Sequence, residues 1–420
     1  MLAGTAVRWA TKHGFMRAGI SAAARKGDEQ ARFFSDPGVR ENPYPFYTSV
    51  REAGPVVPGR LMWATARHDV VSQVLRHDAF GVGFTDRPLP APVALAFRFS
   101  RRSSPIGPVD PPSMLVVDPP DHTRYRRLVS KVFTARAIEG LRPRIERTCA
   151  ELLRDKPADL VADFASLLPV TVIAEILGVP LDMRRQFLAW GHAAAPTLDL
   201  GLSFSTYRRT EINIRKVNNW MRGHFARLRR EPGDDLLSQL VQLDDLGEDE
   251  LLATAGLLLA AGFETTVNLL GTGAWLLMRH PEQLALLREE PQRWGNAVEE
   301  ALRFDPPVQI TARVCRREAE LAGAHIRPGH VVMAMLAGAN RDPAVFADPD
   351  TFDVTRPNAR EHLSFSGGVH YCLGAALARL EGEIGLRMLF ERYPDLRIDG
   401  EPHRRTTRVL RGFDALPVTI

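Results

Sequence analysis

One of the three cysteines, Cys372, lies in a segment whose residue types suit a metal-binding thiolate. The segment reads FSGGVHYCLG from Phe365 to Gly374 and leads into an apolar helical pattern. A helix beginning at Cys372 would aim its free N–H groups and the positive end of its dipole at the sulfur. Gly367 and Gly368 permit a tight turn, Gly374 lets the helix approach a flat ligand, and Phe365 would keep the sulfur dry. The structural alternative is a buried, inert cysteine beside a glycine turn.

A second candidate lies inside a long apolar stretch, where residues 261–266 read AGFETT. The hydroxyl of Thr265 beside the carboxylate of Glu264 could relay protons at a buried site. Gly262 would leave room for a small ligand. Taken alone, Thr265 would more often bond back to its own helix, and Glu264 would pair with a buried cation. The relay interpretation therefore depends on the cysteine segment.

Together these two segments resemble motifs of the cytochromes P450. The pattern F-x-x-G-x-H-x-C-x-G is similar to the haem-binding signature of that family, and AGFETT resembles its oxygen-activation motif. Ser366 stands where the family usually has glycine, and a small serine should be tolerated. The resemblance extends from about Pro43 to Ile420 and is greatest to actinobacterial members.

The resemblance implies a set of site residues. Cys372 would be the ligand of the iron of haem b, and Thr265 and Glu264 would be the catalytic residues. The other residues expected to contact the cofactor are His122, Arg126, Arg313, His370, Phe365, Gly374, Leu115, Ala261 and Gly262. The histidines and arginines in this set would hold the haem propionates, because two carboxylates on an apolar ring must be paired or hydrated.

An E-x-x-R pattern occurs at Glu300 and Arg303. Pairs with this spacing usually stabilise a helix by only about 0.2–0.5 kcal/mol. In the family that the chain resembles, the pair is buried and is joined by an arginine that precedes the cysteine loop; Arg356 matches that position. We expect the three side chains to form an ionic network that holds the cysteine loop in place.

The resemblance implies a monooxygenase that inserts one oxygen atom from dioxygen into a lipophilic organic substrate. The sequence has no flavin or nicotinamide fingerprint, so electrons are expected from a separate ferredoxin and ferredoxin reductase, with Arg124 and Arg127 at the docking surface. One alternative is a haem-thiolate enzyme that uses peroxide or couples its substrates. Another is a non-catalytic haem-binding sensor or carrier, because a fold does not guarantee a function.

The substrate pocket is expected to be lined by mostly apolar segments, which fit a lipid, terpenoid or polyketide. These segments are Leu89–Val109, Leu181–Ser205, the surroundings of Leu258, Val308–Ile310 and Phe413.

Helical periodicity predominates among the elements that must position these residues. Helices are predicted over Ala137–Leu153, Ala165–Ile176, Tyr207–Arg229, Leu251–Met278, Pro281–Leu287, Ala297–Leu302 and Leu373–Phe390. Short β patterns occur at Val331–Met333 and Val418–Ile420, and Arg87–Pro120 is predicted to be a long ordered loop. The fold class is therefore mainly α (α+β): a cytochrome P450 fold with a minor β region. Haem would lie between the long buried helix and the cysteine loop.

The stretch Leu251–Met278 is apolar enough to resemble a membrane span. Glu264 lies at its middle, and a central carboxylate costs roughly 2.5–3.5 kcal/mol in a membrane. We therefore predict a helix buried inside a large protein and no transmembrane anchor.

Composition narrows the remaining possibilities. A net charge of +4 and a pI of about 9.1 are too mild to indicate a nucleic-acid partner. The cysteines are far apart, which favours neither disulfides nor a zinc site and fits a cytoplasmic protein. Residues 1–34 are predicted to be a basic amphipathic helical segment, either packed on the body or lying on a membrane surface. Residues 35–420 would form one domain.

Overall fold

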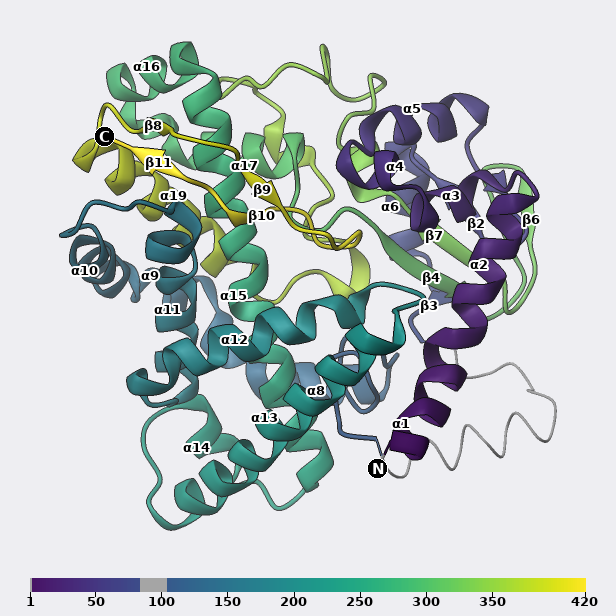
Figure 1. Cartoon of the computed structure of the whole chain (residues 1–420), viewed down its shortest axis with the longest axis horizontal. Coiled ribbons are helices and arrows are strands. Elements are labelled where there is room, and N and C mark those ends of the chain that lie inside the picture. Colours follow the sequence, from purple (N-terminus) through teal and green to yellow (C-terminus); the bar gives the residue numbers. More distant parts are fainter. Residues whose placement is uncertain (1, 84–103) are drawn as a thin grey trace.

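The structure is a computed structural model that describes residues 2–83 and 104–420. Most of the predicted pocket segment Leu89–Val109 and the first part of the loop Arg87–Pro120 lie outside the described residues. Figure 1 shows the main sheet and the N-terminal helices on one side of the molecule and most of the longer helices on the other. The predicted division into a large helical part and a minor β region is thus present.

Helix α15 (Glu248–Arg279) runs through the helical part. Its first turn carries Glu248, Asp249 and Glu250, whose charges suit a helix N-terminus, and Glu250 accepts a hydrogen bond from the N–H of Gly247 at 3.0 Å. Among the described residues it is the one helix long and apolar enough to cross a membrane. However, 61% of its most apolar window is buried against protein, which confirms the prediction of a buried core helix.

Glycines set how closely the neighbouring helices approach α15. A Cβ atom at Gly262 would lie 2.6 Å from Cγ1 of Ile173 in α11 (Leu167–Leu177). A Cβ atom at Gly273 would lie 2.8 Å from Cδ1 of Leu386 in α19 (Ala375–Arg392). Gly262 is therefore required by helix packing, a reason that the sequence pattern did not reveal.

The remaining helices follow the predicted periodicity with some differences. The predicted helix Ala137–Leu153 is divided at Gly140 into α9 (Ala135–Glu139) and α10 (Arg142–Leu152). Helix α12 was not predicted. The other helices of this part are α8 (Asp121–Val129), α12 (Arg184–Ala194), α13 (Phe204–Arg230), α14 (Leu236–Leu240), α16 (Pro281–Glu289) and α17 (Trp294–Phe304), whereas α18 (Leu336–Ala339) packs in the sheet region.

The main sheet has five short strands in the order β1-β2-β7-β4-β3. The β2–β7 pair is parallel, and the other pairs are antiparallel. The strands are β1 (Val57–Pro58), β2 (Trp63–Thr65), β7 (Val331–Ala334), β4 (Thr311–Cys315) and β3 (Phe80–Gly81). Helices α5 (Tyr44–Ala53) and α6 (His68–Arg76) cover it with apolar side chains. The sequence predicted only the pieces at 331–333 and 418–420.

Three further strand pairs complete the β structure of the described residues. They are β5 (Ala319–Leu321) with β6 (Ala324–Ile326), β8 (Arg397–Ile398) with β11 (Val418–Thr419), and β9 (His403–Arg404) with β10 (Phe413–Ala415). We call residues 403–415 the C-terminal hairpin. In Figure 1 this hairpin passes beside α15 toward the N-terminal helices.

Residues 2–25 form one continuous helical rod made of α1 (Leu2–Trp9), the π-helical turn η1 (Ala10–Gly14) and α2 (Phe15–Arg25). The rod is followed by α3 (Glu29–Ser35) and α4 (Pro37–Glu41). Ile20 and Ala23 are buried against Ala31 of α3. Of the two placements considered from the sequence, the structure has the rod against the protein body.

The glycine contacts lead to a matched pair of predictions on α15. Gly262→Ala should lower the free energy of unfolding by about 1–3 kcal/mol, because the new methyl group overpacks Ile173. Gly256→Ala on the same helix should raise it by up to about 1 kcal/mol, because its Cβ would meet nothing within 4 Å and alanine favours helix. Urea unfolding of both variants measures this, and a destabilising Gly256→Ala would contradict the argument.

Candidate active site

The cysteine loop, residues 365–374, is a tight turn closed by a hydrogen bond from the N–H of Cys372 to the carbonyl of Phe365 at 2.9 Å. Gly368 has φ +66°, and a Cβ atom there would lie 2.5 Å from the carbonyl oxygen of Leu75. Ser366 also adopts a left-handed conformation, with φ +62°. Glycine takes this conformation without strain, whereas serine there costs about 1–2 kcal/mol.

The helix after the cysteine starts later than predicted. Helix α19 begins at Ala375 with Gly374 as its N-cap, two residues after the start of the predicted helix Leu373–Phe390 and three residues after Cys372. The backbone N–H of Gly374 still acts on the sulfur and opposes the rise in the pKa of Cys372. A Cβ atom at Gly374 would meet nothing within 4 Å, which suits the close approach of a flat ligand.

The thiol of Cys372 is accessible, yet it lies among enough protein atoms for desolvation to raise its pKa. The N–H of Gly374 and the charges of Arg126 and Arg379 act in the opposite direction without prevailing. A bound cation would supply the missing stabilisation of the thiolate. Among the described residues no group of three or more His, Cys, Asp and Glu could hold a metal ion, so the sulfur would serve as a lone protein ligand.

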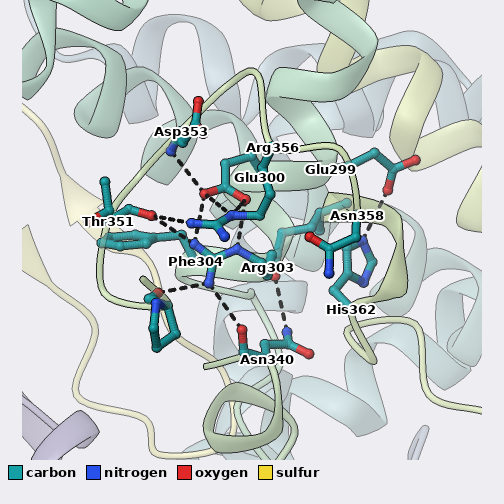
Figure 2. Close-up of polar contacts among 12 residues, drawn as sticks. Glu299, Glu300, Arg303, Phe304, Asn340, Thr351, Asp353, Arg356, Asn358 and His362 are labelled. Atoms are coloured by element: carbon teal, nitrogen blue, oxygen red, sulfur yellow. Dashed lines mark hydrogen bonds and ion pairs between the residues drawn. The ribbon is translucent and has the colours of Figure 1, made fainter. Parts of the chain in front are cut away.

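A buried ionic network fixes the segment that leads to this loop (Figure 2). Glu300 accepts two hydrogen bonds of 2.7 Å from Arg303, and both side chains are fully buried. Arg356 reaches the same carboxylate at 3.2 Å. Both arginines also donate to the carbonyl of Thr351, each at 3.0 Å. The predicted three-residue network is confirmed.

A second buried carboxylate, Glu299, was not singled out from the sequence. It bonds to His362 at 3.0 Å and to Arg379 of α19 at 2.8 Å. The guanidinium of Arg379 lies 4.5 Å from the ring centre of Phe365, and it also donates to the hydroxyl of Tyr371. Glu299 therefore holds both ends of the cysteine loop. The doubled glutamate in the sequence was the one available signal.

Four basic side chains gather beside the loop. His122 and Arg126 come from α8, Arg313 from β4, and His370 from the loop itself. The rings of His122 and His370 have centroids 4.3 Å apart. Burial, then the charges of Arg313 and His122, lower the pKa of His370 to about 4. Asp118 is the nearby carboxylate, 3.6 Å from Nε2 of His370.

This basic cluster fits an anionic group. Arg313 is buried, and burial lowers its pKa from 12.5 to about 10. Within residues 2–83 and 104–420 neither Arg313 nor Arg126 forms an ion pair, and Asp118 is already bonded to Arg316. Nδ1 of His122 and Nε2 of His370 are buried without hydrogen-bond partners. Because buried polar groups are normally bonded, the cluster matches the carboxylates of a haem.

Thr265 and Glu264 occupy a different environment. The hydroxyl of Thr265 donates to the carbonyl of Ala261 at 3.1 Å. Glu264 is buried and forms an ion pair with Arg405 of the C-terminal hairpin, and Nδ1 of His192 on α12 lies 3.4 Å from it. These are the two contacts that the structural alternative expected. Neither Arg405 nor His192 was identified from the sequence, since both partners are distant along the chain.

One side of α15 near Thr265 is accessible to solvent. Ala261 is exposed, and Gly262 and Thr265 are partly exposed, although the helix around them is buried. Leu115 is 40% exposed, and Phe365 is buried beneath the cysteine loop. The predicted pocket residue Phe413 is different: it is buried against Trp275 and lies close to Gly271, so it belongs to the core.

Several known proteins are similar to this chain in sequence and in structure. The family model described as Cytochrome P450 matches residues 217–407. The "Putative cytochrome P450 140" of Mycobacterium tuberculosis is 49% identical, covering 99% of this chain and 97% of its own. The 6-deoxyerythronolide B hydroxylase of Saccharopolyspora erythraea is 44% identical, covering 72% of this chain and 76% of its own.

A solved structure extends the similarity to the fold. P450BioI, crystallised in complex with a hexadec-9Z-enoic acid ligated acyl carrier protein, superposes with a TM-score of 0.83 at 36% identity. The match covers 92% of this chain and all of that one.

The Glu299 contacts give a pH prediction. Burial would raise the pKa of Glu299, but His362 and Arg379 outweigh it and hold the pKa below the ordinary 4.5. The stabilisation is therefore complete above pH 4.5 and is lost as the pH falls through the lower folded-state pKa. Glu299→Gln should be about 3 kcal/mol less stable at pH 7, with a smaller difference at pH 4.

Urea unfolding at the two pH values measures that difference. Glu391→Gln is the control, because Glu391 forms an exposed pair with Arg387 and should contribute less than about 1 kcal/mol. A difference that grows toward pH 4 would show that Glu299 is not held as a carboxylate.

Proposed function

The chain belongs to the cytochrome P450 family, and we propose that it uses dioxygen and electrons from a separate ferredoxin system to hydroxylate a lipophilic organic substrate. Its membership makes it a haem b-dependent monooxygenase. The observation that carries the proposal is the cysteine loop beside a basic cluster in which, among the described residues, neither Arg126 nor Arg313 has an ion-pair partner. The nearby carboxylate of Asp118 is already paired with Arg316. We also propose a cytoplasmic location, which fits three cysteines that are far apart in the sequence.

The proposal assigns the cofactor contacts to residues already described. Cys372 would bind the iron, and His122, Arg126, Arg313 and His370 would hold the propionates. Gly374, Phe365, Leu115, Ala261 and Gly262 would contact the ring. When bound, haem supplies the chemistry of oxygen activation, and a thiolate ligand favours cleavage of the O–O bond. The protein contributes orientation, protons and exclusion of water.

Thr265 and Glu264 would deliver the protons. Thr265 donates its hydroxyl hydrogen to Ala261, so its oxygen remains able to accept a hydrogen bond from a water molecule. Glu264 lies next along the helix and is held by Arg405 and His192. His192 is 38% exposed at its side chain, so it offers a connection between the buried carboxylate and solvent. The ion pair with Arg405 would have to loosen for Glu264 to reach the threonine.

Support for a lipophilic substrate comes from the apolar composition of the expected pocket segments and from relatives. Residues 308–310 meet the C-terminal hairpin through a bridge between Val308 and Leu410. One relative is named for the hydroxylation of 6-deoxyerythronolide B, and a structural neighbour was crystallised with an acylated carrier protein.

For the proposed electron donor, the contacts of the two arginines expected from the sequence favour one of them as a docking residue. Arg124 forms an ion pair with Glu250 and contacts the ring of Tyr125, so its charge is already compensated. Arg127 of the same helix is exposed and is the better candidate for contact with an acidic ferredoxin.

The ligand assignment predicts a spectroscopic result. Cys372→Ser should abolish the strongly red-shifted Soret band of the reduced carbon-monoxide complex, because that band requires a thiolate. Cys315→Ser is the control: its sulfur only donates to the carbonyls of Arg317 and Ile326, away from the loop, and the band should persist. Retention of the band in Cys372→Ser would remove the basis of the proposal.

The proton relay predicts a kinetic result. Glu264→Gln should slow product formation about 100-fold, the lower range for loss of a general acid, and should increase the solvent isotope effect. Asp414→Asn is the matched control, because Asp414 also approaches Arg405, at 3.6 Å, but is 58% exposed. Equal turnover of Glu264→Gln and the wild type would exclude Glu264 from the relay.

A further inference from the structure

The rod of residues 2–25 is fastened to the start of α13 from outside. Arg8 forms a buried ion pair with Glu211. The ring of Trp9 meets Phe204 edge-on, with centroids 5.6 Å apart, and His13 lies against Tyr207 at 5.3 Å. Removing either partner of a buried ion pair leaves an uncompensated charge, so this end of the rod is held firmly.

The same rod holds the chain between α12 and α13, residues 195–203, which we call the connection. Nε1 of Trp9 donates to the carbonyl of Leu202 at 2.8 Å, and Arg17 donates to the carbonyl of Gly201 at 3.0 Å. The two backbones are close at this point: a Cβ atom at Gly201 would lie 3.3 Å from Cα of Arg17. Lys12 also binds Asp110 at 2.7 Å, which ties residues 104–113 to the rod.

On its inner side, the connection touches the tip of the C-terminal hairpin. The carboxylate of Asp199 accepts hydrogen bonds from the N–H groups of Arg408 and Val409, the shorter at 2.9 Å. The carbonyl of Val409 in turn accepts from the N–H of Gln309 at 2.9 Å. Gln309 belongs to one expected wall of the substrate pocket, and the connection belongs to another. The layers therefore run from the rod, through the connection, to the pocket wall.

The connection is itself weakly anchored. Six of its nine residues are only partly buried, and the contacts described above are mainly polar. Segments with few buried apolar contacts open at the lowest free-energy cost. Leu200 of the connection packs against the apolar cluster that buries Ile20 and Ala23 of the rod, so part of the connection's apolar anchoring comes from the rod.

We propose that the N-terminal rod is a strap that limits opening of the connection and so restricts the entry of large ligands to the haem pocket. This inference rests on the proposed function, because it assumes that the pocket lies beneath the connection. Figure 1 shows the rod running along the edge of the molecule from the region of α13 to the sheet, as a strap between these two parts would.

The experiment compares ligand entry in the full-length holoprotein. The double variant Trp9→Phe/Arg17→Ala removes both hydrogen bonds to the connection but keeps an aromatic ring against Phe204. The control is Arg25→Ala, an exposed residue in the last turn of the same rod. Stopped-flow absorbance records the association of imidazole, which is small, and of econazole, which is large, with the haem iron.

We expect econazole to associate at least about tenfold faster with the double variant, as the loss of two hydrogen bonds implies, while the imidazole rate is unchanged. Trp9→Phe alone keeps an aromatic ring against Phe204 and removes only one of the two hydrogen bonds, so it should fold and show a smaller increase. Equal econazole rates in all variants, with imidazole binding intact, would overturn the strap alone. If the wild-type protein bound neither imidazole nor econazole, both the strap and the proposed function would be contradicted.

Discussion

Glu300 brings a negative charge into the protein core, and the position of the cysteine loop depends on how that charge is satisfied. Arg303 lies one turn away on the same helix, whereas Arg356 is 56 residues further along the chain. A buried carboxylate without its cations costs several kcal/mol, so the three side chains become buried together or not at all. The network thus couples the folding of α17 to the placement of the segment that carries Cys372. The preceding residue, Glu299, is also a buried carboxylate with basic partners, His362 and Arg379, which lie on either side of the cysteine loop.

Helix α15 connects the basic cluster beside the cysteine loop with the pair formed by Glu264 and Thr265, which have separate surroundings. At its start, Glu250 accepts a hydrogen bond of 2.6 Å from Tyr125 of α8, the helix that also carries His122 and Arg126. At its middle, Glu264 pairs with the C-terminal hairpin. Close glycine contacts prevent the helix from shifting relative to its neighbours. The basic cluster and the carboxylate–hydroxyl pair are therefore positioned by one rigid element, although no described contact joins them directly.

The parts that the sequence predicted are those encoded locally. Helical periodicity located α13, α15 and α19 to within a few residues, and the spacing of Glu300 and Arg303 indicated a shared helix face. Apart from β7, the strands of the main sheet were not predicted, because they have only two to five residues, too few for a periodic signal. Arg405 and Glu299 escaped prediction because their roles come from partners more than 60 residues away. The exact start of α19 depended on loop strain that no spacing reveals.

Ser366 illustrates how a departure from a family pattern can be compensated. Its backbone takes a conformation that glycine would adopt freely, but its hydroxyl accepts a hydrogen bond of 3.3 Å from Arg313. Glycine at this position would relax the turn and at the same time release the guanidinium from the loop. Ser366 thus strains the backbone of the turn, and its hydroxyl helps to orient the guanidinium of Arg313. In this loop the residue usual in the family would not necessarily improve the site, because glycine would remove the hydroxyl that joins Arg313 to the loop and, within the described part of the chain, would leave Arg313 bonded only within its own strand.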